Sequence, residues 1–409
     1  MIRFNYSKYK NILKLSILQG GTQLGSLIFL IVTAKFLIVE EFGLLSILIG
    51  ISAVASSFLT LGYDTAGLRG YTFDRLLFKI YISEFIVGII ISSIIIIIFI
   101  YLNIILVNYI DIFIIILYSV SLSIISIICS QWKLSVNPHR IIFYKLYGIL
   151  VSLVGISTFS LLDLQIKALN IIELSILGNL FTIYFLFKYL FNSNHSFQID
   201  NNNLNDCKLI ERLKYMFSNV LSVFFNTSPI FILSLFLGSI FVGYYSFCYK
   251  IISGPIWFVF SIQTMGITSQ IVKGNNRSSR ARIIFNKIWF YIIIQFLACA
   301  GIGLSILLLS KISFNFLPYE NIPILAVILA VIITCYQFIG QWRGYCLKLF
   351  SSGSILLAWD CLRVISLIIP VYFSLVLIKY EIFNFSLYLF ADILLSLLII
   401  FYLLKNNLK

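Results

Sequence analysis

The chain has little charge, little proline and almost no histidine. Only 11% of its 409 residues are charged, and it holds 6 prolines and 2 histidines. A soluble domain carries about 25% charged residues, so this chain lacks the polar side chains that would cover a water-facing surface. The shortage excludes a soluble globular enzyme, a disordered chain and a fibrous protein.

Motifs typical of catalytic, nucleotide-binding or metal-binding sites are scarce as well. His139 and His195 do not stand at metal-ligand spacing with any of the seven cysteines. The sequence shows no nucleotide-binding loop and no constellation around a nucleophile. No cleavable signal peptide is evident, because the first apolar run is long and lacks a small-residue cleavage site. We therefore expect no enzymatic activity, no cofactor and no bound metal.

Hydrophobic sequence is what the chain has in abundance. Its residues are 61% hydrophobic, and the mean hydropathy is +1.04. A helix needs about 20 mostly apolar residues to cross the hydrocarbon core of a bilayer. Twelve runs approach or exceed this length: 17–39, 44–62, 80–102, 112–130, 141–161, 171–190, 215–237, 242–265, 283–309, 322–341, 354–377 and 383–404. The sequence predicts an all-α polytopic membrane protein with about twelve transmembrane helices.

One polar stretch divides these runs into two groups of six. It covers residues 192–214, with three consecutive asparagines at 201–203. The stretch is too short and polar for a domain and is typical of a linker. We predict an N-terminal six-helix lobe over 1–191, a cytoplasmic linker over 192–214 and a C-terminal six-helix lobe over 215–409.

The basic residues alternate between the predicted loops. The net charge is +14, and most of the 29 lysines and arginines lie at the two ends, in the linker and in the second, fourth, eighth and tenth loops. The loops between them hold four basic residues: Lys35, Lys167, Lys311 and Lys379. Cytoplasmic loops carry the basic excess, so we expect a multi-pass protein of the cell inner membrane with both termini cytoplasmic. The positive charge then indicates how the chain is oriented in the membrane, and it does not indicate a nucleic-acid partner.

The two halves are weakly self-similar at an offset of 200 residues. Phe36-Leu37 and Gly43 recur as Phe236-Leu237 and Gly243. These residues lie at the tight outer turn between the first two helices of each half. Both halves begin in the cytoplasm, so the repeat is parallel. Transporters commonly carry such repeats and bind substrate between them.

Further short motifs stand at the same turns and helix ends. They are Gly20-Gly21, Ala34-Lys35-Phe36-Leu37, Glu41-Phe42-Gly43, Leu61-Gly62-Tyr63-Asp64 with Arg69, Phe236-Leu237-Gly238, Val242-Gly243-Tyr244-Tyr245-Ser246, Lys250-Ile251 and Phe316-Leu317-Pro318-Tyr319. In order and spacing, and with twelve spans, they resemble the O-antigen flippases, in the polysaccharide-exporting branch of the multidrug/oligosaccharidyl-lipid/polysaccharide (MOP) superfamily. Many members carry an acidic residue in the seventh span, where this chain has Asn226.

The resemblance implies two six-helix lobes around a central cavity that opens alternately to each side of the membrane. It implies a flippase whose cargo is a polyprenyl-pyrophosphate-linked oligosaccharide, handed on to polysaccharide polymerase machinery. Two other functions stay open. One is a small-molecule or drug exporter of the same superfamily. The other is a membrane-embedded O-antigen polymerase or ligase, which we would expect to have a large outer loop carrying Arg or His.

Ionisable side chains inside the spans are candidates for function, because a charge in lipid is costly. Lys250 lies beside Gly254-Pro255, where we expect the helix to bend or break, and it either contacts cargo or pairs with Asp392. Arg363 either faces the cavity or pairs with a carboxylate three residues earlier on the same helix face. The candidate ion-coupling residues are Asp392, Asp360 and Glu84.

Basic and amide residues give two further sets of candidates. Arg69, Arg343 and Lys348 lie where helices reach the basic face of the membrane. They either orient the chain and contact anionic lipid or capture pyrophosphate with charged donors. Asn226 and Gln263 either bind sugar hydroxyls or join helices by hydrogen bonds.

Overall fold

The computed structural model shows helices and no strands in the residues that it describes. These are residues 24–61, 86, 88–94, 96–98, 109–132, 138–161, 166–192, 209–271, 277–311, 319, 322–350, 357–362 and 381–408. In lipid no water is available to bond backbone groups, so a helix, which satisfies them internally, is the natural form of long apolar runs.

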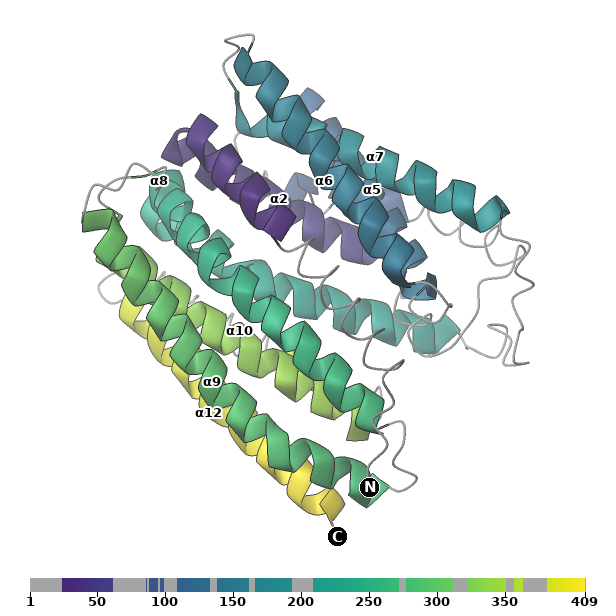
Figure 1. Ribbon diagram of the computed structural model, residues 1–409, viewed down its shortest axis with the longest axis vertical. Helices are drawn as coiled ribbons and strands as arrows, with labels where there is room; N and C mark the ends of the chain where they lie inside the picture. Colours follow the sequence, from purple (N-terminus) through teal and green to yellow (C-terminus); the bar gives the residue numbers. More distant parts are fainter. Residues whose placement is uncertain are drawn as a thin grey trace, which may run out of the picture. The chain divides into compact units, whose positions relative to one another are not determined.

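The chain folds as two compact units, Met1–Thr227 and Ser228–Lys409. Figure 1 shows the helices of both. The chain passes from the first unit to the second inside helix α8 (Leu209–Ile271). Most of the predicted linker over 192–214 falls outside the described residues, so the predicted lobe boundaries stay a prediction.

The first unit contains α2 (Val39–Leu59), α5 (Tyr109–Trp132), α6 (Pro138–Leu161) and α7 (Ala168–Asn192). Helix α7 packs on α5 and α6, and α2 packs on α5 and α7. Glu41 at the start of α2 accepts a 2.9 Å hydrogen bond from the backbone N–H of Ala168 at the start of α7. The first N–H groups of a helix have no partner within it, and the Glu41 carboxylate accepts a hydrogen bond from one of them in α7. Its negative charge also interacts favourably with the positive end of the α7 dipole.

Helices α6 and α7 approach each other closely along small residues. A side chain at Gly178 would place its Cβ 2.3 Å from the backbone oxygen of Gly148. Ser152 donates to the backbone oxygen of Leu174 at 3.1 Å, and Thr182 donates to that of Tyr144 at 3.2 Å. Small residues allow such contact between membrane helices, and the two hydroxyls add hydrogen bonds across it.

Helix α8 carries two of the predicted spans, which meet at Gly238. Gly238 has φ 75° and ψ 174°, and it is the one residue within α8 whose backbone angles are not helical. The corresponding turn in the first half lies at Ile38, before α2, where the backbone is extended. Of the bend or break that we expected at Gly254-Pro255, the break is wrong, because the backbone angles of α8 remain helical there, and the bend stays a prediction. Neighbouring groups can satisfy the carbonyl that a proline leaves free in a membrane helix.

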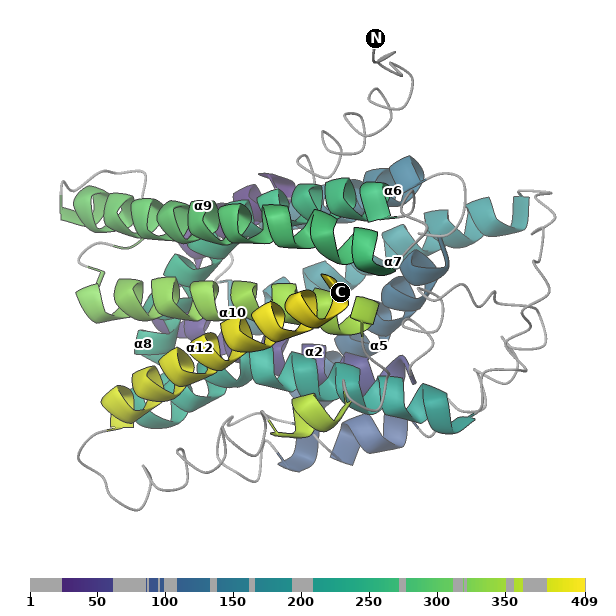
Figure 2. The same cartoon turned by 90° about the horizontal axis from the view of Figure 1, so that it is seen from below.

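The second unit holds α9 (Arg277–Lys311), α10 (Ile324–Phe350) and α12 (Glu381–Leu408), with a helical segment at 357–362. Helix α10 packs on both α9 and α12, and the three lie side by side in Figures 1 and 2. On α9, Phe290, Leu297 and Leu304 are 62%, 65% and 61% exposed. A stripe of large exposed apolar side chains would be a liability in water, and lipid is its natural environment.

Nine of the twelve predicted runs lie in these eight helices, two of them in α8. The other three, 17–39, 80–102 and 354–377, are described only in part, and the described residues of these runs are helical except at 37–38, where the turn before α2 lies. Among the described residues, 5 helices are long and apolar enough to cross a membrane, and one of them is the two-span stretch Leu213–Phe260. The predicted fold class, an all-α polytopic membrane protein, is confirmed.

Candidate functional site

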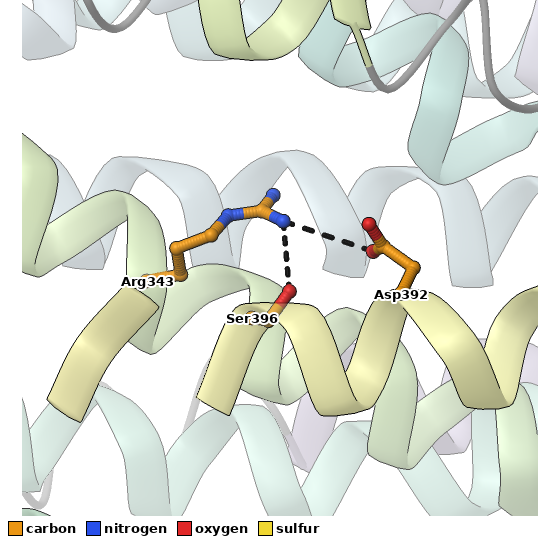
Figure 3. A network of polar contacts seen from close by, with 3 residues as sticks. All are labelled: Arg343, Asp392 and Ser396. Carbon is orange, nitrogen blue, oxygen red and sulfur yellow. Dashed lines mark hydrogen bonds and ion pairs between the residues drawn. The ribbon is translucent and has the colours of Figure 1, made fainter. Parts of the chain in front are cut away.

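A buried ion pair joins α10 to α12 in the second unit. Nη1 of Arg343 lies 3.7 Å from Oδ2 of Asp392, and the two side chains are 2% and 5% exposed. The same nitrogen donates a 2.8 Å hydrogen bond to Oγ of Ser396. Asp392 and Ser396 are four residues apart, so they share one face of α12. Figure 3 shows both directed at the guanidinium of Arg343.

An aromatic ring supports the same guanidinium. The central carbon of the Arg343 guanidinium lies 5.2 Å from the centre of the Trp359 ring, in the segment 357–362. A cation over the face of a tryptophan is attracted by the negative charge of the ring face. Asp360, next in the chain, is buried. Arg343 is therefore held by α12 on one side and by Trp359 on another.

The electrostatics of this pair differ from those of a surface ion pair. Both charges are removed from water, and removal of one partner alone would leave a buried charge uncompensated, at a cost of about 3–5 kcal/mol. At 3.7 Å the contact is longer than the roughly 2.7–2.9 Å of a charge-assisted hydrogen bond.

A second polar cluster, made of amide and aromatic side chains, joins α8, α9 and α10. Gln295 donates to Gln263 at 2.6 Å and accepts from the indole N–H of Trp342 at 3.4 Å. Tyr249 donates to Gln337. These bonds join three helices. We had expected Gln263 either to bind sugar hydroxyls or to join helices by hydrogen bonds, and the structure shows a bond of the second kind.

A cluster of aromatic side chains lies in the second unit, where Tyr319 meets α8. The ring centre of Tyr319 lies 6.0 Å from that of Tyr244 and 5.3 Å from that of Phe247. Two motifs that are 75 positions apart in the sequence therefore meet here. Burial raises the pKa of Tyr319, and the nearby Tyr244 raises it further, so this loop tyrosine stays protonated and packs as an aromatic side chain.

The other predicted site residues have different placements. Lys250 and Asn226 are half-buried in α8. Lys348 lies in α10, but its side chain falls outside the described part of the structure, and Arg69, Arg363 and Glu84 fall outside it entirely. Of the predicted site residues, the structure brings Arg343 and Asp392 together. Their roles in binding cargo or coupling ions stay predictions.

Sequence reasoning missed Trp359, Ser396 and Gln295. Ser396 could have been found, because it follows Asp392 by four residues on the same helix face. Gln295 stands alone among apolar residues in the ninth run, which is itself a signal in a membrane helix. Trp359 gave no signal, since tryptophans near span ends are common interface anchors. No group of three or more His, Cys, Asp or Glu side chains that could hold a metal occurs among the described residues.

Comparison with known proteins shows the fold. No protein-family model matches the sequence, and no curated protein sequence matches it. Among solved structures, an inward-facing multidrug resistance MATE family transporter of the MOP superfamily matches with a TM-score of 0.53 and 15% identity, over 96% of this chain and 95% of that one. The crystal structure of a MATE protein in complex with MaL6 matches with a TM-score of 0.55 and 14% identity, over 96% of both chains. The chain shares its fold with these two proteins.

Proposed function

We propose that this protein is a flippase of the MOP superfamily. It moves a polyprenyl-pyrophosphate-linked oligosaccharide, an O-antigen or related repeat unit, from the cytoplasmic to the outer leaflet by alternating access. The observation that carries the proposal is the likeness of fold to transporters over 96% of the chain. The ordered motifs that resemble O-antigen flippases favour this cargo over others.

The charges of the chain agree with an anionic cargo. The predicted cytoplasmic face is strongly basic, and pyrophosphate must enter from that side. Arg343 places a guanidinium inside the second unit, and arginine offers forked donors that match phosphate oxygens. Lys250, Arg363, Arg69 and Lys348 are further candidates for contact with the headgroup. Coupling to an ion gradient would use a buried acid, for which Asp392 and Asp360 are the candidates.

A small-molecule exporter is the second candidate. It is favoured by the solved neighbours, one of which is described as a multidrug resistance transporter. An exporter of this kind would move free organic cations and would leave the surface glycan unchanged. A polymerase or ligase has no comparable support, because the structural neighbours are transporters.

Deletion of the gene separates the two candidates. The flippase proposal predicts a surface lipid without its glycan and lipid-linked oligosaccharide trapped on the inner leaflet. Expression of the intact chain should restore export, and expression of an unrelated inner-membrane transporter should not. Normal surface glycan in the deletion strain, with no second flippase present, would exclude the proposal. Sensitivity to cationic drugs without a glycan defect would favour the exporter.

A further inference from the structure

The guanidinium of Arg343 is anchored independently of Asp392. Ser396 accepts a 2.8 Å hydrogen bond from Nη1, and the Trp359 ring lies 5.2 Å from the guanidinium carbon. These two contacts come from α12 and from the segment 357–362. The carboxylate can therefore be exchanged for another anion while the cation keeps its position.

The carboxylate does not use the fork of the guanidinium. Nη1 of Arg343 and Oδ2 of Asp392 are 3.7 Å apart, whereas a strong arginine–carboxylate pair makes two parallel hydrogen bonds at about 2.7–2.9 Å. Phosphate oxygens fit the same fork and carry at least the same negative charge. A phosphate group can therefore compete with the Asp392 carboxylate for contact with the Arg343 guanidinium.

We propose that Arg343, Ser396 and Trp359 form an anion site for a phosphate group, and that Asp392 is its resident competitor. The phosphate of the cargo displaces the carboxylate on binding, and the carboxylate returns when the cargo leaves. This inference rests on the proposed transport function and deepens it, because it names the group that the second unit recognises.

The exchange solves a physical difficulty of a cation inside a membrane protein. A buried cation without a counter-ion is strongly destabilising, so a site emptied of phosphate must be refilled by another anion. Asp392 supplies that anion from the protein itself, which lets the cargo leave without exposing an unpaired charge. Selectivity follows from the anchoring of Arg343: an anion has to displace only the carboxylate, whereas an organic cation has to compete with a guanidinium that two other contacts hold in place.

Binding of inorganic pyrophosphate to the purified full-length protein in detergent tests the exchange. We expect Asp392→Asn to bind pyrophosphate at least tenfold more tightly than the natural protein, because the internal competitor is gone. Arg343→Gln should lose binding. Glu173→Gln, on an exposed position of α7, is the matched control for loss of an acid, and Arg282→Gln, exposed on α9, is the control for loss of a cation. Both controls should bind as the natural protein does.

The double variant Arg343→Gln/Asp392→Asn keeps the test valid if a single variant does not fold. It removes both charges of the Arg343–Asp392 pair together, so it should keep a melting temperature near that of the natural protein while binding no pyrophosphate. Pyrophosphate binding by the double variant would overturn the proposal. So would unchanged affinity in a folded Asp392→Asn protein, or no pyrophosphate binding by either the natural protein or Asp392→Asn.

A parallel titration with tetraphenylphosphonium distinguishes this result from failure of the proposed function. If the protein binds this organic cation and does not bind pyrophosphate, both the anion site and the flippase proposal are overturned. If deletion of the gene blocks glycan export while pyrophosphate affinity is the same in all variants, only the exchange at Arg343 is wrong.

Discussion

At the scale of single residues, Gly178 determines how closely α7 packs on α6. A Cβ added at Gly178 would lie 2.3 Å from the backbone oxygen of Gly148 and 2.5 Å from the hydroxyl of Ser152. Backbone cannot yield as a flexible side chain can, so the two helices must separate. We expect Gly178→Ala to lower stability by about 1–3 kcal/mol, the usual cost of an overpacked contact.

The melting temperature of the purified protein in detergent measures this effect. Gly301→Ala on α9 is the control, because an added Cβ there meets nothing within 4 Å and alanine favours a helix more than glycine does. The control should melt at or above the temperature of the natural protein. Equal melting of the two variants would contradict the close contact between α6 and α7.

At the scale of elements, Gly238 sets the turn inside α8. A φ of 75° with a ψ of 174° belongs to a region that is essentially restricted to glycine, at a cost of about 1–3 kcal/mol for other residues. Nothing lies within 4 Å of an added Cβ at Gly238, so a loss of stability in Gly238→Ala reports backbone strain alone.

Gly254→Ala is a closely matched control for that strain. Gly254 lies in the same helix, also has open space around an added Cβ, and has helical backbone angles. Thermal unfolding should show Gly238→Ala destabilised relative to Gly254→Ala. A Gly238→Ala protein as stable as Gly254→Ala would show that the turn does not require a positive φ.

The elements also show what the sequence predicts well. Length and apolar content alone decide whether a segment spans a membrane, so the runs predicted the helices, and the offset repeat predicted the turn at Gly238. Proline was a weaker signal, because the helix break allowed for at Pro255 does not occur and α8 stays helical there. The effect of a proline depends on neighbouring groups that the sequence does not display.

The candidate site was less predictable than the helices. The sequence marked Arg343 and Asp392 separately and offered Lys250 as a partner for the acid, whereas the structure pairs Asp392 with Arg343. Pairing depends on how α10 and α12 are rotated about their axes. Helices with apolar residues on most sides encode that rotation weakly, since lipid-facing and protein-facing residues are alike in polarity.

At the scale of the whole molecule, the orientation in the membrane decides which side of the membrane the basic loops face. Basic loops predict that both termini are cytoplasmic, so alkaline phosphatase, which is active only outside the cytoplasm, should be inactive when fused after Lys409. The same enzyme inserted at the Gly238 turn should be active, because an odd number of predicted spans precedes that turn. A fluorescent protein, which folds in the cytoplasm, should give the reverse pattern at both sites. Active phosphatase at Lys409 would place the basic face outside, and cargo made in the cytoplasm would then meet the side of the protein with few basic residues.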